Sequence, residues 1–131
     1  YYSFSSKMDQ VVEILATRRK KKFIIHVRNE YINLNLEQIL FVEVQNHTLC
    51  YHTLQKIFYT TGNQSLTRLA KELADYGFAR CHQAFLVNLQ YVVRYDKNNV
   101  WLPKDTLSMS RNYYNSFTQA LLNNCSMEGN L

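Results

Sequence analysis

The pairs Cys50 with His52 and Cys81 with His82 contain the residues of this chain best suited to bind a metal ion. Cys50 and His52 are two residues apart, so on a β-strand both side chains point to the same side. Cys81 and His82 are adjacent, so one strand sends them to opposite faces. The paired C-x2-C spacing of structural zinc sites is also absent. The sequence therefore predicts no metal site and no cofactor.

The same residues could serve nucleophilic catalysis, but the chain lacks the parts that such chemistry needs. A Cys–His pair requires a third group to hold the base and a nest of donors for the oxyanion. With three glycines, the chain has no Gly-rich loop, P-loop or dinucleotide fingerprint. We therefore expect that the protein is not an enzyme. Arg80 could lower the pKa of Cys81 and make this thiol redox-active, although a small buried thiol is the preferred interpretation.

A binding edge is the third interpretation of the stretch FARCHQAFLVN, residues 78–88. Residues 84–87 form an apolar run that is typical of a buried strand. The four residues before them are able to make polar contacts. We expect one strand that leaves the core at residues 80–83 and meets a partner there, with residues 84–87 as its anchor.

Length and charge indicate one globular domain with a basic tether. The 131 residues carry a net charge of +5, and residues 18–22 form a run of five basic side chains. Without this run, ten basic residues face ten acidic ones. The run would attract nucleic acid or anionic lipid, or serve as a solvated linker. Three sparse cysteines favour a reducing cytoplasm over a disulfide scaffold.

Periodicity predicts a mainly β domain with two short helices, behind a linker helix at residues 5–20. Ile32, Leu34 and Leu36 alternate with polar residues, as in a half-buried strand. One helix is expected between an N-cap at Ser65 and a stop at Gly77, and the other after a cap at Ser110. We expect three parts: a tether at 1–22 that arrives from an upstream domain of a longer protein, a domain at 23–124, and a tail at 125–131.

The order of motifs resembles the LytTR family of DNA-binding domains. A helix of the form L-x-x-L-x-x-x-L is followed by F-x-R-C-H-Q-A-F-L-V-N-L. The segment ILFVEVQNHTLCYHT looks like the family's hairpin, and LSMSRNYYNSF looks like its closing turn and last helix. The resemblance covers about residues 22–122. It implies an elongated fold of about ten strands in small sheets, with loops that enter successive grooves of DNA.

The resemblance also implies which residues contact DNA. Three positions match the family's base-contacting residues: His47, Gln83 and Arg111. Arginine can donate a bidentate pair to guanine, and glutamine can pair with adenine in the same way. The family often has serine where this chain has Ala84, so a phosphate contact is expected to be missing there. Four neighbours in sequence are expected to contact the DNA backbone: Arg80, Lys104, Ser110 and Asn112. His82 is expected to be structural.

The resulting hypothesis is a cytoplasmic transcription factor, the output domain of a bacterial two-component response regulator. An upstream receiver domain and its sensor kinase would control it. The domain would bind double-stranded promoter DNA as a homodimer on repeated half-sites, with no small-molecule substrate. One alternative is a protein–protein interaction module that uses an exposed sheet edge. Another is the same domain on a membrane-bound parent, with the basic run near lipid headgroups.

Overall fold

The computed structural model describes residues 22–62 and 64–124. Over these residues the chain forms ten strands and two α-helices, with three short 3-10 turns at Leu36–Gln38, Ala74–Tyr76 and Leu89–Tyr91. The elements in chain order are β1 Lys22–Val27, β2 Glu30–Asn35, β3 Ile39–Gln45, β4 Thr48–Thr53, β5 Ile57–Tyr59, α2 Leu66–Leu73, β6 Phe78–His82, β7 Phe85–Asn88, β8 Arg94–Tyr95, β9 Asn99–Trp101, β10 Thr106–Ser108 and α3 Arg111–Asn124.

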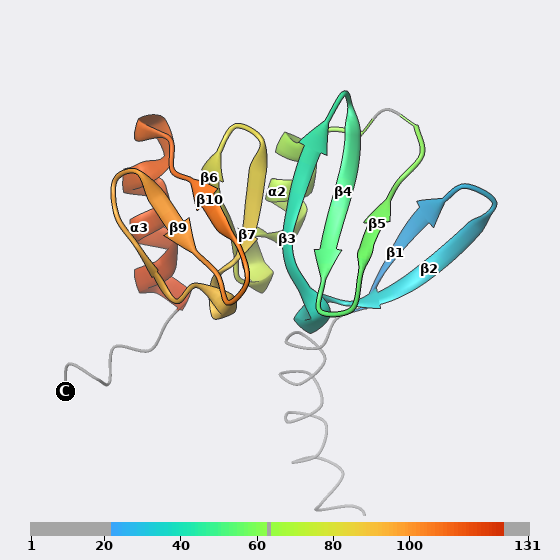
Figure 1. The fold of residues 1–131 in the computed structure, drawn as a ribbon, viewed down its shortest axis with the longest axis horizontal. Helices are drawn as coiled ribbons and strands as arrows, with labels where there is room; N and C mark the ends of the chain where they lie inside the picture. The colour runs from blue at the N-terminus through green and yellow to red at the C-terminus, as the bar shows by residue number, and fades with distance from the viewer. Residues whose placement is uncertain (1–21, 63, 125–131) are drawn as a thin grey trace, which may run out of the picture.

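The strands form three antiparallel sheets that follow one another along the long axis of the molecule (Figure 1). The central sheet has five strands in the order β5-β4-β3-β7-β6. The hairpin of β1 and β2 stands at one end, and the three-stranded sheet β10-β9-β8 stands at the other end beside α3. The prediction of an elongated, mainly β fold of small sheets with two short helices is confirmed.

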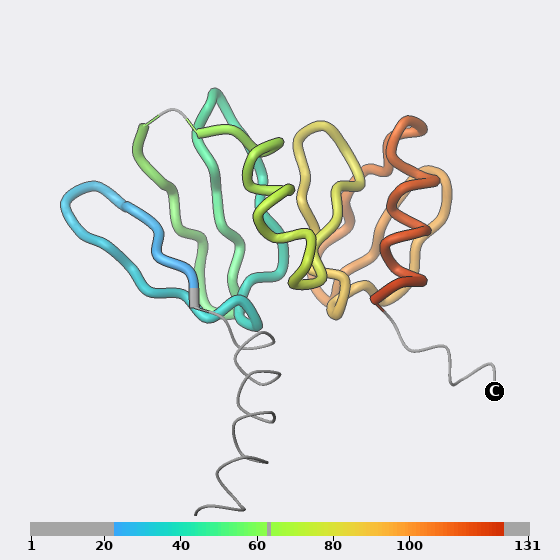
Figure 2. Tube along the Cα trace, turned by 180° about the vertical axis from the view of Figure 1, so that it is seen from behind, coloured from blue at the N-terminus to red at the C-terminus, as the bar shows by residue number. Residues whose placement is uncertain are grey.

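Two hydrophobic clusters cover the two faces of the central sheet. On one face, Val42 and Leu49 pack with Leu69 of α2 and with the β1–β2 hairpin. Seen from behind, α2 crosses this face (Figure 2). On the other face, Phe41 packs with Phe117 of α3 and with the three-stranded sheet. Burial of each such side chain stabilises the fold by about 1.5–3 kcal/mol. Because β3 contributes to both clusters, it joins the two halves of the domain.

The signals that were expected to bound the first helix have their predicted roles. The side chain of Ser65 accepts a hydrogen bond from the backbone N–H of Arg68 at 3.2 Å, which is N-cap geometry. Gly77 follows the 3-10 turn with a φ of 88°, in the left-handed region that glycine adopts without steric cost. Its carbonyl accepts the N–H of Leu89 at 2.8 Å, so the chain returns directly into the sheet.

Residues 78–88 form a hairpin, which corrects the expectation of one continuous strand. β6 and β7 pair antiparallel on either side of a turn at Gln83 and Ala84. The pairing shifts between Arg80 and His82, and Nδ1 of His82 accepts the N–H of Ala84 at 3.0 Å. This bond closes the turn, so His82 has the structural role that was expected. The apolar run thus belongs to the returning strand β7 and not to the end of β6.

Several expectations fall outside the described residues. These are the linker helix at 5–20, the basic run up to Lys21, Cys125 and the tail at 125–131. Within the described ranges, neither helix has the length and the apolar composition to cross a membrane.

Candidate nucleic-acid interface

His47 stands at the tip of the hairpin that joins β3 to β4. Asn46 and His47 connect the paired residues Gln45 and Thr48, and both have positive φ, at 50° and 68°. Two central residues with positive φ are the mark of a type I′ turn, whose twist matches that of the flanking strands. His47 is exposed at this tip. The turn therefore presents an imidazole to solvent from a rigid two-stranded support.

Gln83 stands at the tip of the neighbouring hairpin, with its side chain exposed. The N–H of Val44 donates to the carbonyl of Ala84 at 3.0 Å, next to the pairing of β3 with β7. This bond aligns the ends of the two hairpins, so the tips with His47 and Gln83 lie at the same edge of the central sheet (Figure 1).

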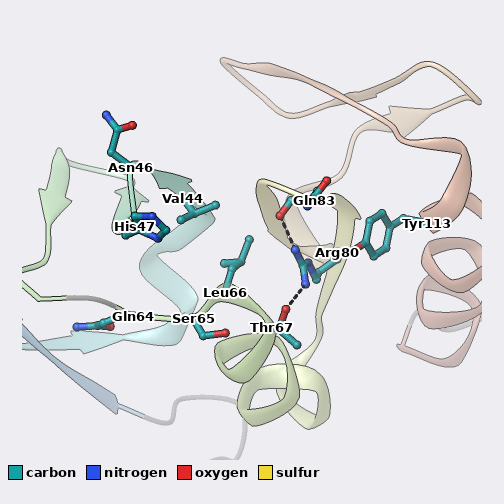
Figure 3. A pocket seen from close by; sticks show the side chains of 10 residues that line it. All are labelled: Val44, Asn46, His47, Gln64, Ser65, Leu66, Thr67, Arg80, Gln83 and Tyr113. Atoms are coloured by element: carbon teal, nitrogen blue, oxygen red, sulfur yellow. Dashed lines mark hydrogen bonds between the residues drawn. The ribbon is translucent and has the colours of Figure 1, made fainter.

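A groove of about 720 Å³ separates these two tips. Asn46 and His47 form one side, Arg80 and Gln83 form the other, and Leu66 lies between them (Figure 3). We call it the central groove. Its lining residues are Val44, Asn46, His47, Gln64, Ser65, Leu66, Thr67, Arg80, Gln83 and Tyr113. No carboxylate is among them, so the described residues that line the groove place no negative charge against an anion.

Arg80 connects the far wall of the central groove to two helices. Its Nη1 donates to Oγ1 of Thr67 in α2 at 2.9 Å, and its Nη2 donates to the carbonyl of Gln83. Its guanidinium lies over the ring of Tyr113 in α3, 5.2 Å from the ring centroid. Sequence reasoning identified Arg80 but neither Thr67 nor Tyr113, because these contacts join segments that are distant in sequence.

Arg111 is the first residue of α3 and is exposed. The N–H of Ser110 donates to the carbonyl of Cys81 at 2.7 Å, which holds the start of α3 against β6. The start of α3 therefore lies at the same edge as the two hairpin tips (Figure 1). We call this edge, formed by Asn46 with His47, Gln83 with Ala84, and Arg111, the turn edge.

Arg111 lines a second groove, of about 690 Å³, rather than the central one. Its other lining residues are Lys97, Asn98, Met109, Tyr114 and Asn115, again without a carboxylate. We call it the outer groove. The first turn of α3 separates the two grooves, because Tyr113 lines the central one and Tyr114 the outer one. The structure thus brings His47 and Gln83 into one groove and places Arg111 in the next.

The expected backbone contacts divide into two groups. Ser110 and Asn112 flank Arg111 on the turn edge, and Asn112 is exposed. Lys104 is exposed in the turn between β9 and β10, and the register of these strands places that turn at the opposite end from Ser108 and Ser110. The structure therefore separates Lys104 from the turn edge.

Sequence reasoning missed Lys97, which reaches the outer groove. The turn before β9 was recognised, but its position beside Arg111 depends on a hydrogen bond of 2.9 Å from the N–H of Met109 to the carbonyl of Asn98. No local pattern in the sequence reports that bond.

Cys81 is buried, with an exposed fraction of 0%, and its thiol donates to the carbonyl of Ser108 at 3.5 Å. Burial raises the pKa of Cys81 to about 12. The raised pKa and the burial of Cys81 fit the small buried thiol that was the preferred interpretation, and the guanidinium of the adjacent Arg80 is bonded to Thr67 and Gln83. A thiol protonated at neutral pH is a poor nucleophile.

The residues considered as metal ligands have other partners. Nε2 of His52 lies 3.0 Å from Oε1 of Glu43, and its ring stacks on Phe41 with 4.0 Å between centroids. Cys50 is buried, and burial together with the charge of Glu43 raises its pKa. Over residues 22–62 and 64–124, no three His, Cys, Asp or Glu side chains are placed to share one ion.

Comparison with known proteins identifies the domain type. The family model of the LytTr DNA-binding domain matches residues 29–122. A solved structure described as the LytTr DNA-binding domain of a putative methyl-accepting/DNA response regulator from Bacillus cereus superposes with a TM-score of 0.66. The match has 15% sequence identity and covers 77% of this chain and 96% of that chain, so it demonstrates a shared fold. No curated protein sequence matches the chain.

Proposed function

The chain belongs to the LytTR family of DNA-binding domains, and we propose that it is the output domain of a bacterial response regulator that binds promoter DNA through the turn edge. The family is one of DNA-binding domains and not of enzymes. One observation carries the proposal: three loops that are distant in sequence lie along one edge, and the two grooves beside the first turn of α3 have no carboxylate among their described lining residues.

Each base-reading residue has a chemistry suited to its place on the turn edge. Arg111 donates two parallel hydrogen bonds to O6 and N7 of guanine, the commonest specific contact in the major groove. Gln83 donates to N7 and accepts from N6 of adenine. His47 donates or accepts according to its tautomer. The grooves on either side of α3 leave room for the DNA backbone between the loops.

Contacts to phosphate fix the register of the domain without reading sequence. Ser110 and Asn112 make such contacts beside Arg111. Lys97 joins them, since it lies in the outer groove with Arg111. Lys104 is left out, because its turn lies at the far end of β9 and β10.

In the parent protein, a phosphorylated receiver domain upstream of this chain promotes dimerisation, and a sensor kinase supplies the signal. Two copies then bind repeated half-sites of a promoter in the cytoplasm. Support comes from the description of the structural neighbour, which belongs to a putative DNA response regulator.

Substitution of Arg111 tests the base-reading role. A duplex selected by the wild-type chain from a randomised pool is compared with a random duplex of equal length in gel shifts. Arg111→Ala is expected to lower the ratio of the two affinities about fivefold or more, the least that one bidentate contact contributes.

Lys104→Ala is the matched control, because it removes one positive charge away from the turn edge and should leave the ratio unchanged. If Arg111→Ala weakened both duplexes equally, Arg111 would not read a base. If the wild-type chain bound no duplex at low salt, the turn edge would need a different partner, such as a protein.

A further inference from the structure

We propose that Arg80 is a positioning residue that fixes the direction of Gln83 and the start of α3, in place of the phosphate contact expected from the sequence. This inference rests on the proposed function, because it specifies how the turn edge holds its base-reading side chains. Arg80 then contributes to sequence specificity without contacting DNA.

The hydrogen bonds of Arg80 are made within the protein. Its two terminal nitrogens donate to Thr67 and to the carbonyl of Gln83, so the guanidinium spans from α2 to the tip of the β6–β7 hairpin (Figure 3). Hydrogen bonds from a charged donor are about twice as strong as neutral ones. The carbonyl of Gln83 is therefore anchored at the residue whose side chain is exposed for reading.

One side of the guanidinium is enclosed. Nε of Arg80 is buried, and it has no hydrogen-bond partner among the described residues. A bidentate phosphate contact uses two adjacent N–H groups on one side of the guanidinium. Burial of Nε closes the side that it shares with a terminal nitrogen, and both terminal nitrogens already donate inside the protein. Arg80 therefore has little remaining capacity for phosphate, although it lines the central groove.

The same side chain reaches the second base reader. The guanidinium faces the ring of Tyr113, which is two residues after Arg111 on the first turn of α3. A flat, delocalised cation stacks on an aromatic ring in a way that the ammonium of lysine does not reproduce. One residue thus braces the tip with Gln83 against α2 and against the helix that begins with Arg111.

Lysine at position 80 separates positioning from charge. Arg80→Lys keeps the positive charge, so a residue that acts on phosphate keeps most of its effect. It loses the planar fork and the stacking, so a positioning residue loses its effect. Thr67→Val removes the partner of Nη1 without a change of charge, and it should alter specificity in the same direction to a smaller extent.

The experiment measures binding of the 131-residue chain to the selected duplex and to a random duplex over a range of salt concentrations. Arg80→Lys is expected to lower the ratio of the two affinities about fivefold or more, as loss of one bidentate base contact would. The slope of log affinity against log salt should stay unchanged, because no phosphate contact is lost. Discrimination at the base pair that Gln83 is proposed to read is measured with a duplex changed at that pair. In a chain that already has Gln83→Ala, Arg80→Lys should cause no further loss of this discrimination.

Arg94→Lys is the matched control. Arg94 also lies over an aromatic ring, 3.7 Å from the centroid of Trp101, but it pairs with β9 near the end where Lys104 lies. The same substitution there should leave the ratio unchanged. Thermal unfolding followed by circular dichroism establishes that each variant is folded. If Arg80→Lys fails to fold, Thr67→Val decides the question.

Two results would overturn the inference. In the first, Arg80→Lys leaves the ratio of the two affinities unchanged, and Arg80→Ala lowers the affinity for both duplexes equally. The salt slope of Arg80→Ala is then also reduced by about one, as for a lost phosphate contact. The other is an unchanged ratio in a folded Thr67→Val variant if Arg80→Lys is unfolded. Failure of the proposed function would look different, because the wild-type chain itself would bind neither duplex.

Discussion

His47 combines an exposed imidazole with a backbone conformation that glycine adopts more easily. A left-handed conformation costs a residue with a side chain about 1–2 kcal/mol, and glycine gives back up to about 1 kcal/mol through its greater freedom in the unfolded chain. The φ of 68° at His47 thus adds strain at a residue proposed to read DNA. Sequences optimised for such turns alone have Asn-Gly, and this one has Asn-His.

We therefore expect His47→Gly to raise the free energy of unfolding by up to about 1 kcal/mol while it weakens binding to the selected duplex. Urea denaturation gives the first quantity and gel shifts give the second. His47→Ala is the comparison, since it removes the imidazole and keeps the strain. The expected exchange of stability for DNA reading would be contradicted if His47→Gly lowered the free energy of unfolding. It would also be contradicted if His47→Gly left the discrimination between selected and random duplexes unchanged.

At the scale of elements, α2 supports the turn edge as well as the core. Its buried face packs on the central sheet, and its first turn lines the central groove through Ser65, Leu66 and Thr67. The N–H of Gln64 donates to the carbonyl of His47 at 3.4 Å, so the segment that leads into α2 also contacts the β3–β4 tip. The placement of both groove walls depends on how this helix begins.

Ser65→Ala should lower the free energy of unfolding by about 0.5–2 kcal/mol, because the N–H of Arg68 loses its capping acceptor. Thermal or urea unfolding measures the change. Ser65→Asp supplies another capping oxygen and should keep most of the stability. Equal losses in the two variants would show that the cap is not the cause.

The helices could be predicted because their signals are local. A cap at Ser65, a stop at Gly77 and apolar residues three and four positions apart all lie within one short segment. The hairpin at residues 78–88 could not be predicted in this way, because its turn depends on pairing of β7 with β3 and on a register shift between Arg80 and His82. The apolar run and the polar residues before it were identified correctly, but their division into two strands was not.

The same reasoning applies to the candidate site. The resemblance named His47, Gln83 and Arg111, and their convergence on one edge could not be derived from spacing. Lys104 is closer to Arg111 in sequence than Lys97 is, yet Lys97 shares a groove with it. Separation in sequence does not predict separation in space here, because β9 and β10 run antiparallel. The turn before β9 therefore lies beside the end of β10.

At the scale of the whole molecule, the positive charge of the proposed DNA-binding edge is local. Outside residues 18–22 the chain has ten basic and ten acidic residues, so no general attraction to DNA follows from the domain's net charge. The described grooves nevertheless lack carboxylates. Association through the turn edge should therefore depend on few phosphate contacts, each of which contributes about 0.9 to the salt slope.

Lys97→Ala is expected to reduce the slope of log affinity against log salt by about 0.9, equally for selected and random duplexes. Fluorescence anisotropy titrations at several salt concentrations measure it. Lys104→Ala has the same charge change at the far end of the sheet and should leave the slope as it is. The opposite pattern would mean that DNA lies along the β9–β10 turn.

The left-handed turn at Asn46 and His47 also limits how such a protein can change its target over evolution. Few amino acids with side chains tolerate that conformation, chiefly asparagine, aspartate and histidine. The choice of side chains at the tip is therefore small. Positions 83 and 111 have negative φ and accept many side chains. In the proposed interface, divergence of target sequences among descendants of this domain should arise mainly through those two positions, and the base pair that residue 47 is proposed to read should change slowly.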